Sequence, residues 1–150
     1  MIIRRAIGAA ALAVLLTAAA PADWGNLSHW VGRYPTDGDV RPPARLFDVP
    51  AIRAEMEQLL SSADRNRLRA LSVETPIEQI GPFLIIKQCM PHDCGNQNAI
   101  VVLDGTTRRM WVGLFARTPA VTSTRWFGTG DFHALPAEVL RSFDQQHEPQ

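Results

Sequence analysis

The sequence predicts an α+β fold in which helices pack on one face of a central antiparallel β-sheet. Segments with the spacing of amphipathic helices lie before residue 82, whereas segments of strand length, rich in β-branched and aromatic residues, follow it. The strand segments are almost continuously apolar, which indicates central strands that are covered on at least one face. The helices upstream are the simplest cover.

The start of the chain has the pattern of a secretory signal peptide, residues 1–22. Arg4 and Arg5 precede an apolar run that is too short to span a bilayer, and the small residues of a cleavage site follow. Cleavage after Ala22 would leave a mature chain of 128 residues, 23–150, which is enough for a single domain with its own core. We therefore expect a periplasmic protein with no membrane segment in its mature form.

The mature chain would open with an irregular arm that is rich in Trp, Gly and Pro. This arm carries Trp24, Trp30 and Tyr34 and extends to Pro43. Its aromatic side chains are expected either to pack on the core or to extend an interaction surface.

Two helices are predicted after the arm. In the segment 47–60, Asp48 can cap the helix and Pro50 suits its first turn. Ser62 is the candidate cap of a second, shorter helix over 62–73. The apolar residues expected to face inward are Ile52, Met56, Leu59 and Leu60 in the first helix and Leu68 and Leu71 in the second.

Four antiparallel strands and a last helix complete the predicted fold. The strands are expected over 83–89, 98–104, 108–117 and 121–128. Asp104 and Gly105 indicate a tight turn between the second and third of them. The helix is expected over 135–146, opened by Pro136, with Leu140 and Phe143 facing the core.

The charge pattern argues against a nucleic-acid partner. The chain has 15 basic and 15 acidic residues, and loss of the leader would leave 13 and 15. The arginines are scattered among acidic residues, and the one cluster, over 65–69, is typical of a solvated helix face. We therefore expect no nucleic-acid binding.

The most informative segment is QCMPHDCGNQ, which holds both cysteines of the chain, Cys89 and Cys94. Redox catalysis is disfavoured, because thiol–disulfide catalysts use Cys-x-x-Cys at a helix N-terminus. A closed zinc site would need a fourth ligand beside the cysteines and His92, and no other histidine has ligand spacing. A disulfide is the normal state of a cysteine pair in an exported protein and is the stronger interpretation.

Such a disulfide could be a simple staple, with His92 merely exposed. A ring of this size reduces the entropy of the unfolded chain by only roughly 2 kcal/mol, so stiffness would be its larger effect. Pro91 fixes its own backbone and restricts Met90, and Gly95 permits a sharp exit. A stiff loop could hold the His92 imidazole ready for a partner, as protease-inhibitor loops hold their contact residues. Asp93 could bond backbone amides in the turn or orient the His92 ring.

The segment CMPHDCG, followed by NQNAIVVLDGTTRRMWVGLFAR, resembles the signature of the inhibitor of vertebrate lysozyme family. These are bacterial periplasmic proteins with the pattern Cys-Lys-Pro-His-Asp-Cys-Gly and a downstream strand that ends in Gly-Leu-Phe. The resemblance is close from Phe83 to Ala116 and continues through TRWFG. It implies an α+β fold with a central antiparallel sheet, a disulfide between Cys89 and Cys94, and a protruding loop that plugs the substrate cleft of a lysozyme.

In that family the loop histidine hydrogen-bonds the two catalytic carboxyl groups of the enzyme, a role that would fall on His92. Met90, Pro91 and Asp93 would complete the inhibitory loop, and the expected partner is a c-type lysozyme. The hydrolase needs one carboxylic acid and one carboxylate beside the scissile bond, and an imidazole between them can satisfy both. The family's lysine after the first cysteine is Met90 here, which can pack against an apolar cleft wall.

We expect neither an enzyme nor a bound cofactor or metal, because no Ser-His-Asp set, phosphate-binding loop or dinucleotide signature is visible. Two alternatives stay open. The loop could bind one of the bacterium's own peptidoglycan-cleaving enzymes, such as a lytic transglycosylase, or a wall fragment. The cysteines and His92 could instead belong to a thiol or metal enzyme.

Overall fold

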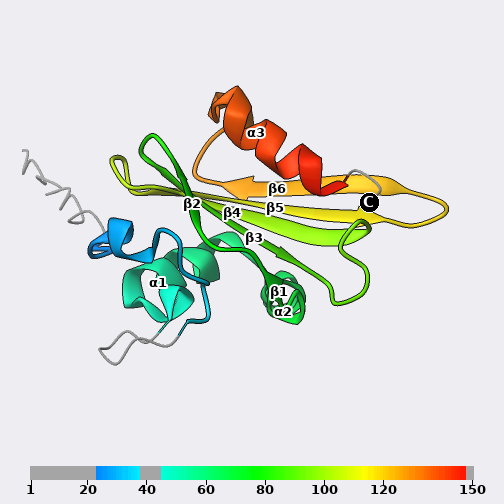
Figure 1. Cartoon of the computed structure of the whole chain (residues 1–150), viewed down its shortest axis with the longest axis horizontal. Helices are drawn as coiled ribbons and strands as arrows, with labels where there is room; N and C mark the ends of the chain where they lie inside the picture. The colour runs from blue at the N-terminus through cyan, green and yellow to red at the C-terminus, as the bar shows by residue number, and fades with distance from the viewer. Residues whose placement is uncertain (1–22, 38–44, 148–150) are drawn as a thin grey trace, which may run out of the picture.

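The computed structural model describes residues 23–37 and 45–147 (Figure 1). The predicted signal peptide 1–22 and its cleavage site lie outside these residues. Within them, no helix is long and apolar enough to cross a membrane. The elements are, in order, η1 (Leu27–Trp30), η2 (Leu46–Asp48), α1 (Pro50–Leu59), α2 (Ser62–Ala70), β1 (Val73–Glu74), β2 (Glu78–Ile80), β3 (Phe83–Cys89), β4 (Gln97–Asp104), β5 (Arg109–Arg117), β6 (Thr122–Gly128), η3 (Phe132–Ala134), α3 (Ala137–Asp144) and η4 (Gln145–His147).

The strands form a six-stranded antiparallel sheet, which confirms the α+β class. The strand order is β1-β3-β4-β5-β6, and β2 also pairs with β3. The four predicted strands are confirmed to within one residue at each end. Strands β1 and β2 were not predicted, because they have two and three residues and owe their conformation to pairing with β3.

Helices cover both faces of this sheet, so the expectation of cover on one face is wrong for the last helix. Helices α1 and α2 lie below the sheet in the view of Figure 1, and α3 lies above it. Alternate strand residues supply the two faces: Leu84 packs with the α1 and α2 side, whereas Ile85 packs with Val139 and Phe143 of α3. Both faces of the central strands are apolar, and each therefore needs a cover.

The helix starts differ from the predicted caps. Val49 is the N-cap of α1, and Asp48 lies in η2 and makes no side-chain cap bond. Ser61, not Ser62, caps α2, since its hydroxyl accepts a hydrogen bond from the Asp64 amide at 3.1 Å. Which of two neighbouring residues caps a helix depends on the backbone geometry there, which the sequence does not give.

The tight turn indicated at Asp104 and Gly105 is a four-residue loop between β4 and β5. The last paired residues are Asp104 and Arg109. The Asp104 carboxylate accepts hydrogen bonds from the amides of Thr106 and Thr107, at 2.8 and 3.0 Å. The positive φ that such a loop requires is at Arg108 (56°) and not at Gly105.

The arm packs on the core at two of its three aromatic positions. Trp24 and Trp30 are 1% and 5% exposed and join the core between the sheet and the first two helices. Tyr34 is 42% exposed. The two tryptophans therefore serve the core, and not an interaction surface.

Candidate functional site

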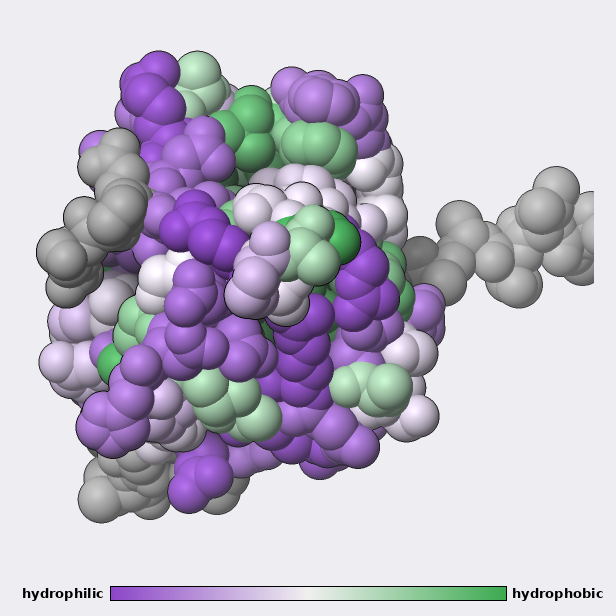
Figure 2. Space-filling view, turned by 90° about the vertical axis from the view of Figure 1, so that its right-hand side faces the viewer, coloured by the Kyte–Doolittle hydropathy of each residue, from purple (hydrophilic) through white to green (hydrophobic). Residues whose placement is uncertain are grey.

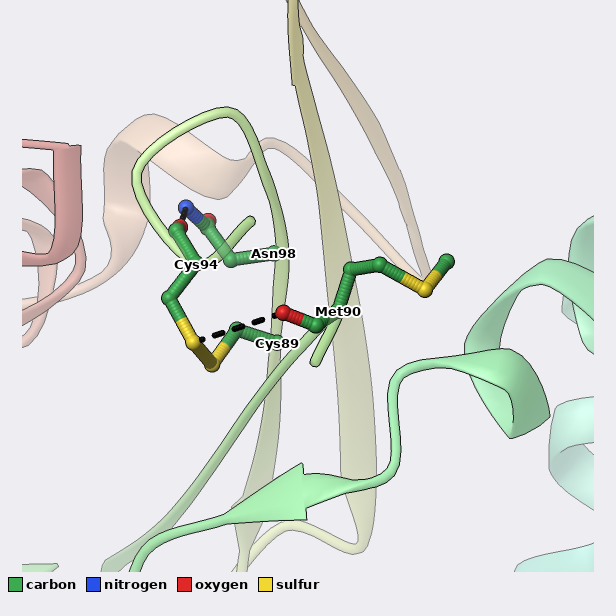
Figure 3. The surroundings of a disulfide bond; sticks show 4 residues. All are labelled: Cys89, Met90, Cys94 and Asn98. Atoms are coloured by element: carbon green, nitrogen blue, oxygen red, sulfur yellow. Dashed lines mark hydrogen bonds between the residues drawn. A yellow bond between two sulfur atoms is a disulfide. The ribbon is translucent and has the colours of Figure 1, made fainter. Parts of the chain in front are cut away.

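The segment with the two cysteines forms a closed loop between β3 and β4 at one end of the sheet (Figure 3). Cys89 is the last residue of β3 and forms a disulfide with Cys94, with 4.8 Å between their Cα atoms. The Met90 amide donates to the Gln97 carbonyl at 2.9 Å, which extends the strand pairing into the loop. The disulfide expected between the two cysteines is confirmed.

The tip of the loop is a β-turn with His92 at its third position. The Asp93 amide donates to the Met90 carbonyl at 3.0 Å, and Pro91 and His92 occupy the two central positions. His92 has a φ of +62°, the left-handed value that type II turns require there. Pro91 and His92 are both exposed. Gly95, which was expected to permit a sharp exit from the ring, does not have a positive φ, whereas His92 does.

Asp93 holds the loop together through side chains that follow it. Its carboxylate accepts hydrogen bonds from Asn96 Nδ2 at 2.7 Å and from Gln97 Nε2 at 2.8 Å. These two bonds lower the pKa of Asp93, against a smaller opposing effect of desolvation. Its carbonyl also accepts from the amides of Asn96 and Gln97, at 3.0 and 2.9 Å. The carboxylate thus bonds neither a backbone amide nor the His92 ring, the two partners that the sequence suggested.

Met90 turns away from the disulfide (Figure 3). Its side chain is half-buried and packs against the core on the α1 and α2 side of the sheet. The Cys94 sulfur lies 3.6 Å from the Met90 carbonyl oxygen, the pair joined by a dashed line in Figure 3. A disulfide sulfur has no proton to donate, so this is a sulfur–oxygen contact and not a hydrogen bond. Met90 therefore anchors the base of the loop.

The loop shares its end of the molecule with the hairpin that connects β5 and β6 (Figure 1). The Arg117 amide at the end of β5 donates to the Asn96 carbonyl at 2.8 Å and so ties the two together. Figure 2 looks onto this end of the molecule, where the surface is largely hydrophilic with small apolar areas between the polar ones. A partner that receives the loop would meet a mainly polar surface around it.

A cleft of about 540 Å³ lies elsewhere, among α1, α2 and β1. Its lining includes Arg53, Arg69 and Glu74 but no cysteine or histidine among the described residues. No group of three or more His, Cys, Asp or Glu side chains in 23–37 and 45–147 could hold a metal ion. The cysteines and His92 that the sequence singled out therefore do not line this cleft.

Comparison with known families decides the relationship. A family model described as "Inhibitor of vertebrate lysozyme (Ivy)" matches residues 51–149. The chain belongs to this family. The match begins within α1 and includes every strand, the disulfide loop and α3, so the Ivy relationship extends well beyond the segment 83–116 on which the resemblance was seen. Ivy membership implies lysozyme inhibition and a lysozyme as the partner. Searches of curated proteins and of solved structures gave no match.

Proposed function

We propose that this Ivy family member is a periplasmic, non-enzymatic inhibitor that blocks c-type lysozymes by inserting the loop Cys89–Cys94 into their substrate cleft. The observation that carries the proposal is the position of His92, exposed on the turn of a disulfide-closed ring. Pro91 and the bond from the Asp93 amide to the Met90 carbonyl leave this turn little freedom. A recognition group that is already ordered loses little conformational entropy on binding.

The His92 imidazole has the hydrogen-bonding pattern that a lysozyme active site offers. A neutral imidazole carries one donor nitrogen and one acceptor nitrogen. In lysozyme-type hydrolysis one carboxyl group is protonated and acts as the acid, and the other is ionised. The ring can therefore donate to the carboxylate and accept from the acid, and at the same time exclude sugar and water.

The internal bonds of Asp93 suit the same function. If the Asp93 carboxylate were free to face the enzyme's active site, the ionised catalytic carboxylate there would repel it. Asn96 and Gln97 occupy the oxygens of Asp93 within the loop. The loop thus exposes the imidazole to the enzyme, while the Asp93 carboxylate stays hydrogen-bonded within the loop.

Export to the periplasm is the setting in which this loop would be stable. Disulfides form and persist in oxidising compartments such as the bacterial periplasm, and Cys89 and Cys94 are joined. The pattern of residues 1–22 is that of a signal peptide. Mass spectrometry of the protein from a periplasmic fraction should give a mature chain that begins at Asp23.

The deciding experiment is an inhibition assay with purified mature protein. We expect it to slow the lysis of peptidoglycan by a c-type lysozyme with one inhibitor bound per enzyme. Lysozymes of other classes and the bacterium's own lytic transglycosylase, assayed in parallel, define the range of partners. Activity against the transglycosylase alone would reassign the loop to an endogenous enzyme, and activity against neither would refute the proposal.

A further inference from the structure

The second half of the loop is anchored by Asn98, a polar side chain with no exposed surface. Asn98 is the second residue of β4 and pairs with Cys89 across the sheet. Its Nδ2 donates to the carbonyl of Cys94 at 2.8 Å, so the Asn98 amide reaches back to the far cysteine of the ring (Figure 3). A buried amide this close to the disulfide fixes where the ring leaves the sheet.

The other end of the Asn98 amide contacts the C-terminal turn η4. Asn98 Oδ1 lies 3.1 Å from His147 Nε2. Since Nδ2 already donates to Cys94, the oxygen faces the ring, and His147 Nε2 must carry the proton of this bond. The neutral form of His147 is therefore the Nε2–H tautomer.

Aromatic and backbone contacts hold η4 in this place. The His147 ring stacks on Phe115 of β5 with 3.7 Å between ring centroids and meets the edge of Phe143 of α3 at 4.6 Å. The Arg117 guanidinium donates to the His147 carbonyl at 3.1 Å. The turn at the end of the chain is thus packed against the strand that also bonds the loop through the Arg117 amide.

We propose that Asn98 and His147 form a clamp that positions the inhibitory loop, so that lysozyme inhibition depends on the C-terminal turn through the loop. Asn98 is the positioning residue, because it bonds the loop at Cys94, and His147 holds the Asn98 amide in place. The proposal rests on the proposed function for its effect on lysozyme, whereas the clamp itself can be measured on the free protein. It extends the functional site from the loop to a turn that is 49 residues away in sequence from Asn98.

The bond from His147 to Asn98 does not depend on protonation, because Nε2 carries a proton in both the neutral and the charged ring; what changes with pH is the cost of burying the partly buried ring. Burial lowers its pKa below 6.5 as the main cause; Asp144 of α3 acts in the opposite direction and Arg117 of β5 in the same one. The folded state therefore favours the neutral ring. The stability that the buried neutral ring contributes is complete above pH 6.5 and is progressively lost as the pH falls from 6.5 through the lower pKa of the folded state.

The first test follows the backbone amides of the free loop by hydrogen exchange at pH 7.5. In His147→Phe the stacking surface is kept and the donor to Asn98 is lost. We expect the amides of Asp93 and Asn96 to exchange about tenfold faster than in the wild type, the effect of losing one hydrogen bond. In His147→Gln an amide donor replaces the imidazole, and we expect part of the protection to return. Wild-type exchange rates in His147→Phe would overturn the clamp, whatever the protein does to lysozyme.

The second test measures the inhibition constant against a c-type lysozyme from pH 7.5 to 5. The ratio of the His147→Phe constant to the wild-type constant cancels any pH dependence that the two proteins share. We expect a ratio of about ten at each pH, because Nε2 of His147 keeps its proton in both charge states of the ring and the donor is lost only in His147→Phe. A ratio of one throughout would overturn the proposal. Failure of the wild type to inhibit is a separate outcome that contradicts the proposed function and leaves the exchange test to decide the clamp.

Asn98→Ala provides the matching change at the other partner. This change removes the Nδ2 donor to the Cys94 carbonyl as well as the acceptor of the His147 bond, so its loop amides should exchange at least as fast as those of His147→Phe. The double variant should add little to Asn98→Ala, because that change already removes the connection that His147→Phe removes. Additive effects of the two changes would show that Asn98 and His147 act separately and would refute the clamp.

Discussion

The Asp93 carboxylate accepts a hydrogen bond from Gln97 Nε2 at 2.8 Å, and this bond joins the turn of the loop to the first residue of β4. The neighbouring side chain, His92, is exposed. The two adjacent residues therefore differ in their roles: Asp93 stabilises the conformation of the loop, and His92 is exposed on its surface. Changes at the two positions should be distinguishable by experiment.

His92→Ala should weaken binding to a c-type lysozyme by roughly 2 to 4 kcal/mol, the size expected of a contact residue at the centre of an interface. In the proposed mode of binding, this variant loses both imidazole hydrogen bonds to the enzyme's carboxyl groups. Titration calorimetry with purified lysozyme measures the affinity, and thermal unfolding should show little change, because the side chain is exposed.

Two further variants make the His92 test specific. Alanine at a φ of +62° is strained, whereas glycine adopts this conformation freely, so His92→Gly removes the ring without that strain. We expect His92→Gly to bind as poorly as His92→Ala. His133→Ala removes another exposed histidine, in η3, and should bind like the wild type. Full affinity of His92→Gly would remove the imidazole from the interface.

Opening the disulfide should impair inhibition more than folding. Replacing Cys89 and Cys94 by serine releases a ring of six residues, whose closure contributes roughly 2 kcal/mol to stability. The two cores of the sheet do not depend on it, so the melting temperature should fall by no more than about 10 °C. The free energy of binding to lysozyme should weaken by more than the free energy of unfolding does, since the turn at His92 loses its constraint. Global unfolding of the variant would show that the ring is required by the fold itself.

The sequence predicted best those parts of the protein whose signal is local and long. Strands β3, β4 and β5 are runs of seven to nine residues with many β-branched and aromatic side chains. Strands β1 and β2 have no such signal, because their hydrogen bonds come from β3. The place of α3 on the second face was missed because apolar residues on both sides of a strand do not tell which helix covers which side.

The same distinction holds for the site. The ring of Cys89 and Cys94 and the exposed His92 lie within six residues, and the motif was sufficient to find them. Asn98 and His147 are brought together only by the folded sheet, and nothing in the sequence pairs an asparagine in a strand with a histidine near the end of the chain. The bonds of Asp93 to Asn96 and Gln97 were missed although the sequence spacing of three and four residues could have suggested them.

Gly128 should not tolerate a side chain, because it lies directly beside Trp111. A Cβ at Gly128 would be 2.5 Å from Trp111 Cδ1 and 3.0 Å from the Met110 carbonyl oxygen. Gly128→Ala should therefore destabilise the protein by about 1 to 3 kcal/mol, the usual cost of overpacking. Gly95→Ala is the matched control, since a Cβ there has no atom within 4 Å. Urea unfolding of the two variants measures the difference, and equal stabilities would contradict the close approach of β5 and β6 at this point.

The edge strand β6 is tied to α2 by an ion pair between Arg125 and Asp64. The other Asp64 oxygen accepts a hydrogen bond from the Ser61 hydroxyl at 2.7 Å, so one carboxylate serves both the cap of α2 and the strand. The bonds from Arg125 and Ser61 lower the pKa of Asp64, and burial opposes them. A carboxyl group with a lowered pKa contributes stability that is present above pH 3.8 and is lost as the pH falls through its folded value.

Arg125→Met should therefore destabilise the protein at pH 7 by about 1 kcal/mol, a modest effect because the Arg125 side chain is 51% exposed and water screens the pair. At pH 2.5 the two proteins should differ less, since the stability that the pair contributes declines as the pH falls below 3.8. Urea unfolding at both pH values measures these differences. Arg141→Met, which changes an exposed arginine of α3, should match the wild type at both. A deficit of Arg125→Met that is the same at pH 7 and pH 2.5 would mean that the arginine stabilises β6 through its packing over Phe127, 5.4 Å away, and not through its charge.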